Sequence, residues 1–372
     1  MPHALSGDQS AASRWIGYAR FLLTRGEEAR SLALAFPSPD HVLEAAETPM
    51  LRLWRRDVLA PVDKAALFPP ASWALPISDE DYSPLLAECS DAPCLLFGRG
   101  DPSVLTKPAI AIVGSRQPSL DGCSLAEHFG HDLARAGFVI VSGLASGIDT
   151  AAHRGAIKAG GQTIAVVATG IDTTYPRSNR SLCEEIVKNG AVVSQFLPTS
   201  APKKHHFPRR NRTLSGLSLA TVVIEAGVPS GTLITATAAE QGRDVFALPW
   251  SVNHRGGRGC LELLMDGALL ALKPADVIRA VNWSQPHTSV PDLDEAAFED
   301  TAHTEALSNP PENEAFDLLL AAMGDGYHSA EDLAAALSLD IRVVHQALAQ
   351  LEIDGQLTRQ GQAHWARAAL VR

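Results

Sequence analysis

Short, almost wholly apolar runs recur along the middle of the chain, from about residue 105 to residue 285. Each run is continuous rather than alternating, which is typical of strands in a parallel sheet that is covered on both faces. More polar, helix-length stretches separate the runs. The predicted strands are 109–113, 138–142, 163–168, 191–194, 221–225 and 244–248, and the predicted helices are 123–136, 148–159, 180–188 and 232–241.

Strand, glycine-containing turn and helix repeated in this order indicate an α/β fold. We predict a Rossmann-like, doubly wound and mostly parallel sheet for residues 80–284. Ligands of such sheets bind beyond the carboxyl ends of the strands, so the loops that follow the strands are the first place to look for a site.

The segment before the sheet has a helical pattern. Residues 1–75 predict a helical domain of the SAM or helix-hairpin-helix kind. Its first helix covers residues 15–23 with Ser13 as its N-cap, and a second covers residues 40–46 after Ser38.

The segment after the sheet divides into two parts. Residues 285–312 combine prolines with aspartates and glutamates and predict an acidic linker. Residues 313–372 predict a winged-helix domain with three short helices and a hairpin. These elements are expected at 313–323, 329–337, 340–351 and 356–365.

Composition narrows the class of protein. The chain has 372 residues, of which 46% are hydrophobic and 20% charged, as in a globular protein with a sizeable core. No run approaches the roughly 18 apolar residues of a membrane helix, and no secretion signal is evident, so we expect a cytoplasmic protein without a membrane partner. The five cysteines show no CxxC spacing, so neither a metal site nor a disulfide framework is expected.

A basic segment at residues 203–212 stands out in a chain whose net charge is −11. Phe207 lies among its cations, and arginine beside an aromatic ring suits single-stranded nucleic acid. Phe207 would stack on a base, and Asn211 would orient the turn or contact a sugar. The alternative is a solvated loop neutralised by acidic side chains from elsewhere. The cations are Lys203, Lys204, Arg209, Arg210 and Arg212.

Three loops that follow predicted strands suit an anion. Backbone amides, a hydroxyl and a guanidinium in the first loop would form a phosphate cradle. The glycines of the second would allow close backbone approach, and the third opens a helix. The alternative is a set of tight turns with a surface arginine. The loops contribute Gly114, Ser115 and Arg116; Gly143 and Gly147; and Ser230, Gly231 and Thr232.

Two side chains near the second loop are expected to be structural. Asp149 would cap or orient the loop, and His153 has no visible nucleophile as its partner. Two absences limit the chemistry further. The GxxxxGK[ST] pattern of P-loop ATPases is missing, and the second strand lacks the acidic residue that would hold a ribose, so no cofactor is expected.

The motifs taken together resemble those of the DNA-processing protein A (DprA/Smf) family. The resemblance spans roughly residues 80–270, in order. It is carried by Gly-Ser-Arg at 114–116, Ser-Gly-Leu-Ala-x-Gly-Ile-Asp-x-x-Ala-His at 142–153, Gly-x-x-x-x-Tyr-Pro at 170–176, Phe-Pro-x-Arg-Asn-Arg at 207–212 and Ser-Gly-Thr-Leu-Ile-Thr-Ala at 230–236.

The resemblance implies a non-enzymatic protein of natural transformation and recombination. Such a protein binds and protects single-stranded DNA, loads the recombinase RecA onto it, and forms a homodimer through the Rossmann domain. By matching position, the implied DNA contacts are Ser115, Arg116, Lys204, Phe207, Arg209, Arg210 and Arg212.

Three positions depart from the family pattern. Gln195 replaces a usual glutamate, Trp250 a usual glycine and Leu261 a usual asparagine. None removes a cation from the predicted site, and two of the three lie in the 250–262 loop.

Two other functions stay open. A nucleotide phosphoribohydrolase of the lysine-decarboxylase-like group would need a glutamate where this chain has Thr235, so its proton carrier is missing. A winged-helix transcription regulator would read duplex DNA through the helix at 340–351, where Arg342 is the single strong cation.

Overall fold

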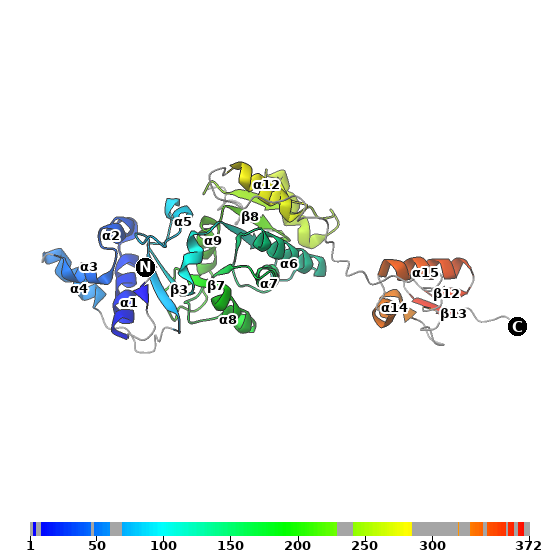
Figure 1. The fold of residues 1–372 in the computed structure, drawn as a ribbon, viewed down its shortest axis with the longest axis horizontal. Coiled ribbons are helices and arrows are strands. Elements are labelled where there is room, and N and C mark those ends of the chain that lie inside the picture. Colours follow the sequence, from blue (N-terminus) through cyan, green and yellow to red (C-terminus); the bar gives the residue numbers. More distant parts are fainter. Residues whose placement is uncertain are drawn as a thin grey trace. The chain divides into compact units, whose positions relative to one another are not determined.

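The computed structural model describes residues 3–4, 9–45, 48–59, 69–228, 241–284, 319, 328–337, 341–354, 356–360 and 364–367. The chain divides into two compact units, Met1–Leu293 and Asp294–Arg372. The N-terminal helices therefore share one unit with the large sheet (Figure 1). No described helix is long and apolar enough to cross a membrane.

A ten-stranded sheet of order β1-β2-β3-β7-β6-β5-β4-β8-β9-β10 forms the centre of the first unit. Strands β4 to β10 pair in parallel, whereas β1, β2 and β3 join one edge antiparallel. This confirms the predicted α/β fold with a mostly parallel sheet. The strands are β1 (His3–Ala4), β2 (Ser72–Pro76), β3 (Leu95–Gly100), β4 (Ala109–Val113), β5 (Val139–Ser142), β6 (Thr163–Val166), β7 (Gly190–Ser194), β8 (Ala220–Val223), β9 (Asp244–Ala247) and β10 (Leu269–Leu270).

The chain winds outward from β4 to β7 and then returns to β8 on the other side of β4. The carboxyl ends of β4 and β8 therefore flank the topological switch point, where sheets of this kind bind ligands. The helices of the first unit are α1 (Gln9–Leu23), α2 (Ala29–Ala35), α3 (Pro39–Glu44), α4 (Pro49–Val58), α5 (Pro84–Glu88), α6 (Leu120–Arg135), α7 (Ile148–Lys158), α8 (Arg180–Asn189), α9 (His206–Gly216), α11 (Arg258–Met265) and α12 (Pro274–Ser284), with short 3₁₀ turns at Gly26–Glu28, Pro102–Thr106, Arg177–Asn179 and Arg255–Gly257.

Both faces of the sheet are buried. Side chains alternate between the two faces along each strand, so neighbouring strand residues report on opposite faces. Val192 of β7 packs in a cluster with Leu182 and Ile186 of α8. The next residue, Val193, belongs to the cluster that contains Leu214 of α9. The continuous apolar runs of the sequence therefore reflect helices on both sides.

Two predicted helix caps have different outcomes. Ser38 caps α3 as predicted, since its side chain accepts a hydrogen bond from the amide of His41. The cap predicted at Ser13 is wrong, because α1 begins at Gln9 and Ser13 lies inside it. Although polar residues precede Trp15 in the sequence, the helix includes them. The face of the helix that contains Trp15 is buried in the core, and the polar Ser13 lies on its exposed face.

The second unit has the winged-helix elements that the sequence predicts. Helices α14 (Ala330–Leu337) and α15 (Ile341–Ile353) pack around a small core. Three strands pair in the order β11-β13-β12, namely β11 (His328–Ser329), β13 (His364–Arg367) and β12 (Leu357–Gln360). Of the helix predicted at 313–323 only residue 319 is described, and the 285–312 linker lies outside the described residues.

Candidate nucleic-acid interface

A pocket of about 300 Å³ opens at the carboxyl ends of β4, β5 and β6, beside the first turns of α9. The pocket brings together one face of α9 and the loops that follow the three strands. Its lining is Arg116, Gln117, Gly143, Ala145, Ser146, Ala168, Thr169, Tyr175, Pro176, Phe207 and Arg210.

The Phe207 ring is the centre of the polar and aromatic groups in this pocket. The Arg116 guanidinium carbon lies 4.9 Å from the ring centroid, and that of Arg210 lies 6.0 Å from it. Tyr175 meets the same ring edge-on at 6.3 Å. Arg116 and Tyr175 are exposed. A cation and two rings thus share one rim, as the sequence predicted for Arg116 and Phe207.

Arg210 has a different environment from Arg116, because it is buried, with 6% of its surface exposed. Its Nη1 donates to the carbonyl oxygen of Val166 at 3.0 Å. Burial lowers the pKa of Arg210 below its ordinary value, with the nearby charge of Asp149 opposing the shift and Arg116 adding to it. The guanidinium therefore supports the pocket wall rather than reaching freely into solvent.

Asp149 is the buried carboxylate beside Arg210. Burial raises the pKa of Asp149, while the charge of Arg210 and hydrogen bonds from backbone amides oppose the shift. The amide of Ala145 donates to Oδ2 at 3.2 Å, so Asp149 orients the loop as predicted. A Cβ at Gly143 would lie 1.4 Å from Nη1 of Arg210, which explains why glycine is needed there.

The backbone of the first loop is bound to its neighbours. The amide of Ser115 donates to the carbonyl oxygen of Glu225 at 2.7 Å, and its own carbonyl accepts from the amide of Ile148 at 3.1 Å. The Ser115 hydroxyl accepts from the amide of Gln117 at 3.1 Å. The predicted phosphate cradle therefore needs correction, because the Ser115 amide already joins this loop to Glu225 and the Gln117 amide is bonded within the loop to the Ser115 hydroxyl.

Two glycines of these loops allow close approach of the protein's own backbone, whereas their approach to an anion stays a prediction. Gly147 has a φ of +83°, which favours glycine, and a Cβ there would lie 2.4 Å from the carbonyl oxygen of Ser115. A Cβ at Gly114 would lie 2.7 Å from the carbonyl oxygen of Glu225. Ser230, Gly231 and Thr232 lie outside the described residues.

Residues 206–212 of the basic segment form the first turns of helix α9, and Lys203 and Lys204 precede the helix. Asn211 therefore lies in a helix and cannot orient a turn there. Residues 207 and 210 line the pocket described above, whereas residues 209 and 212 line another. The sequence predicts all the cations of the segment at one rim, and this prediction is wrong, because its arginines line two different pockets. The cause is helical periodicity, because side chains three residues apart share a face.

The remaining cations of the segment also differ in their surroundings. Arg212 pairs with Asp91 at 2.8 Å, a carboxylate far away in the sequence. Arg209 lies 5.7 Å from the Phe196 ring centroid. Lys204 is exposed and Asn211 is partly buried, and neither lines the pocket.

The 250–262 loop, where the sequence departs from the family pattern, packs against the switch point. Trp250 stacks on His254 at 4.4 Å and donates through Nε1 to the carbonyl oxygen of Ile224 at 2.7 Å. His254 Nε2 lies 3.4 Å from the buried carboxylate of Glu225. The Trp250 indole thus anchors this loop to the end of β8.

Of the eleven residues that line the pocket, the sequence named Arg116, Gly143, Phe207 and Arg210 as site residues and missed the other seven, Tyr175 and Gln117 among them. Tyr175 was named within a motif but not as a site residue, because its exposure is visible only in the structure. Aromatic residues are enriched at interfaces, so the residue type was the one signal in the sequence. Gln117 directly follows the Gly-Ser-Arg motif and lines the pocket, but an isolated glutamine gives no signal in the sequence.

Two family models match the chain. The model described as DNA recombination-mediator protein A matches residues 73–282, and the DprA winged helix domain matches residues 303–362. The first match alone covers more than half of the chain and contains the whole pocket.

Curated relatives agree with these models. The DNA processing protein DprA of Streptococcus pneumoniae is 45% identical over 203 residues, which is 54% of this chain and 72% of the relative. Protein Smf of Escherichia coli is 35% identical over 283 residues, which is 76% of this chain and 74% of the relative. The first of these relatives is named as a DNA-processing protein.

Two solved structures resemble the fold. That of DprA from Streptococcus pneumoniae has a TM-score of 0.59 and 35% identity, and covers 71% of this chain and 95% of its own. The structure of DNA processing protein A from Helicobacter pylori has a TM-score of 0.51 and 29% identity. The match covers 55% of this chain and 95% of the Helicobacter pylori chain. That structure is described as giving insight into a single-stranded DNA binding mode of the Helicobacter pylori protein. Since the motifs, the fold and both family models agree, this chain belongs to the DNA recombination-mediator protein A family, the DprA/Smf proteins.

Proposed function

We propose that this protein binds single-stranded DNA at the pocket formed by Arg116, Tyr175 and Phe207. The observation that carries the proposal is the exposed guanidinium of Arg116, 4.9 Å from the Phe207 ring, at the rim of a pocket of about 300 Å³. A cation beside rings suits an unpaired strand, because the phosphate meets the charge and a base stacks on a ring. The single-stranded DNA binding described for the Helicobacter pylori relative supports it.

The DNA surface that we propose is smaller than the one predicted from the sequence. Arg116 and Phe207 form its rim, Arg210 supports it from below, and Ser115 shapes the loop. Lys204 is exposed just before α9 and can add charge along the strand. Arg209 and Arg212 are left out, because they line a different pocket.

We propose that binding, not catalysis, is the role of this site. The carboxylate beside the pocket, Asp149, is buried and holds backbone amides, and His153 is wholly buried against Thr163. Neither is placed to carry a proton to a substrate. The protein would protect incoming strands and load RecA onto them during transformation and recombination in the cytoplasm.

We also propose that two copies associate through the β10 edge of the sheet. Strand β10 pairs only with β9 among the described residues, and apolar side chains around it are exposed. Met265 is 79% exposed, Leu270 51% and Leu272 65%. An exposed apolar edge strand favours pairing with another chain.

The binding proposal is tested with Arg116→Ala, since this arginine is exposed and its loss should leave the fold intact. We expect weaker binding of an oligo-dT strand and a salt dependence of log K that is shallower by about one unit, because one phosphate contact is lost. Fluorescence anisotropy over a salt series measures both. Arg154→Ala, an exposed arginine on α7, is the matched control and should bind like the unchanged protein.

Equal affinity and slope for Arg116→Ala and the control would contradict the proposed site. The role in recombination is tested separately, by the rate of RecA filament formation on strands coated with single-strand-binding protein. The unchanged protein should speed this step, and Arg116→Ala should speed it less. No acceleration by a protein that does bind the strand would refute the loading role alone.

A further inference from the structure

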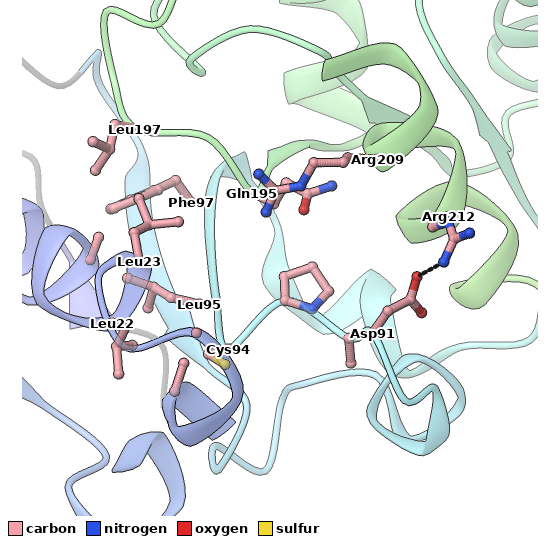
Figure 2. A pocket seen from close by; sticks show the side chains of 15 residues that line it. Leu22, Leu23, Asp91, Cys94, Leu95, Phe97, Gln195, Leu197, Arg209 and Arg212 are labelled. Carbon is pink, nitrogen blue, oxygen red and sulfur yellow. Dashed lines mark hydrogen bonds and ion pairs between the residues drawn. The ribbon is translucent and has the colours of Figure 1, made fainter. Parts of the chain in front are cut away.

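A second pocket, of about 490 Å³, lies beside α9 (Figure 2). It is on the other face of this helix from the proposed DNA site, because Arg209 and Arg212 line it whereas Phe207 and Arg210 line the DNA site. Three parts of the first unit meet at the second pocket: the end of α1 and the turn after it, the segment that enters β3, and α9 with the loop after β7. Its lining is Ala19, Leu22, Leu23, Gly26, Ala29, Asp91, Ala92, Pro93, Cys94, Leu95, Phe97, Gln195, Leu197, Arg209 and Arg212.

The body of this pocket is apolar and mostly aliphatic. Leu22 and Leu95 are buried in its walls, whereas Leu23 at its edge is 55% exposed. Its aromatic residue, Phe97, is 1% exposed and offers no open ring face. A nucleobase would find no surface on which to stack, so an aliphatic or aromatic side chain of a protein fits these walls better.

The charge at this pocket is positive and unbalanced. Asp91 is paired with Arg212 at 2.8 Å, as the dashed line in Figure 2 shows. Arg209 is exposed, and no carboxylate pairs with it within the described part of the chain; its guanidinium lies 5.7 Å from the Phe196 ring. One cation thus remains available for a partner's carboxylate beside an apolar cavity.

We propose that this pocket binds an acidic peptide segment of a partner protein, with a bulky apolar side chain in the cavity and a carboxylate on Arg209. Charge complementarity and the aliphatic walls carry the proposal. It reassigns Arg209, which the family resemblance implied as a DNA contact. It also places peptide and DNA on opposite faces of α9, so that both could be held at once.

The probe is a fluorescein-labelled peptide, Asp-Asp-Asp-Leu-Phe with a free carboxyl end, added to the full chain. The comparison peptides are Lys-Lys-Lys-Leu-Phe, which reverses the charge, and Asp-Asp-Asp-Gly-Gly, which lacks the apolar side chains. We expect the first peptide to bind most tightly, and both others to bind at least about tenfold more weakly.

Two exposed substitutions test the two halves of the site. Leu23→Asp should weaken binding of the acidic peptide about tenfold, and Arg209→Glu should reverse the preference between the acidic and the basic peptide. The matched controls are Leu34→Asp, which changes a leucine that is 54% exposed on α2, and Arg154→Glu on α7. Both controls should bind the peptide as the unchanged protein does.

Binding of an oligo-dT strand to the same variants separates the peptide site from the DNA site. Affinity for the strand should change less than threefold in Leu23→Asp, whatever the fate of the DNA proposal. The inference is overturned if the unchanged protein does not bind the acidic peptide, or if Leu23→Asp and Arg209→Glu bind it like their controls. It is also overturned if both variants lose DNA affinity while keeping peptide affinity, because the pocket would then hold a nucleotide.

Discussion

The surroundings of each arginine decide what it can bind. Arg116 is exposed beside a ring, Arg210 is buried beside Asp149, and Arg212 is paired with Asp91. Three arginines from two sequence motifs thus have three different surroundings: one is exposed beside a ring, one is buried, and one forms an ion pair. A partly exposed ion pair such as Arg212–Asp91 contributes little stability, but it removes a cation from the surface available to DNA.

His153 shows how a buried group near the site affects stability. Its Nδ1 lies 2.7 Å from the hydroxyl of Thr163, which donates to the carbonyl oxygen of Ile140, so His153 donates to Thr163. Burial, with the charge of Arg210 adding to it, lowers the pKa of His153 to about 3. The unfolded chain protonates this histidine below its ordinary value of about 6.5, whereas the folded protein does not.

We therefore expect acid to destabilise the protein through His153. Between about pH 6.5 and pH 3 the unfolded state holds the extra proton, so stability falls as pH falls. From pH 7 to pH 5 this histidine should cost about 2 kcal/mol. The free energy of unfolding is measured with urea at pH 7 and at pH 5, for the unchanged protein and for His153→Leu. Its decrease between the two pH values should be smaller by about 2 kcal/mol in His153→Leu than in the unchanged protein. Equal losses in the two proteins would show that His153 is not the group responsible.

The sequence identifies some of these roles and not others. The Gly-Ser-Arg motif after a predicted strand placed Arg116 at the correct edge, because the carboxyl ends of parallel strands share one edge. The burial of Arg210 and the pairing of Arg212 were not predictable, since their partners Asp149 and Asp91 lie 61 and 121 residues away in the chain. Contacts over such separations depend on the tertiary fold.

At the scale of elements, the strands were predicted more reliably than the basic helix. Strand β4 has the predicted bounds, and the other five predicted strands differ by one or two residues. Helix α9 was missed because its cations suggested a loop, although Pro208 in its first turn is compatible with a helix start. The antiparallel pairing of β2 and β3 was also missed, because pairing partners are not visible in one sequence.

Helix α6 begins at a residue that joins two elements. Ser119 accepts a hydrogen bond from the amide of Gly122 at 3.0 Å and donates to Oε2 of Glu225 at 2.7 Å. Glu225 is 2% exposed and follows β8. The cap of α6 therefore also satisfies a buried carboxylate at the switch point between β4 and β8.

Ser119→Ala should for this reason destabilise the protein more than the loss of an ordinary cap. The comparison is Ser83→Ala, which removes the cap of α5, where the Ser83 side chain accepts from the amide of Leu86 at 3.3 Å. We expect Ser83→Ala to lower the free energy of unfolding by about 1 kcal/mol, and Ser119→Ala by about 2 kcal/mol, because a buried carboxylate also loses a donor. Urea unfolding measures both, and equal losses would count against the double role of Ser119.

At the scale of the whole molecule, local charge and total charge differ. The chain has a net charge of −11, yet an exposed arginine lies at the edge of each pocket beside α9. Salt screens the distant acids over about 10 Å, so the total charge does not prevent a local anion site. The order of helical, sheet and winged-helix segments was visible in the sequence because the hydrophobic period changes between them. The grouping of the N-terminal helices with the sheet was not, because it depends on the antiparallel pairing of β2 with β3 and of β3 with β7, which one sequence does not show.

The proposed dimer is the last property that can be tested at this scale. The double substitution Leu270→Glu with Leu272→Glu places two charges at the apolar β10 edge. In the proposed dimer a second copy buries this edge. Burying charge without partners is costly, so the variant should sediment as a monomer at concentrations where the unchanged protein sediments as a dimer. The matched control is Leu34→Glu with Leu53→Glu, two leucines that are 54% and 52% exposed on α2 and α4. Analytical ultracentrifugation of all three proteins at several concentrations decides the matter, and a dimer that persists in the β10 variant would place the interface elsewhere.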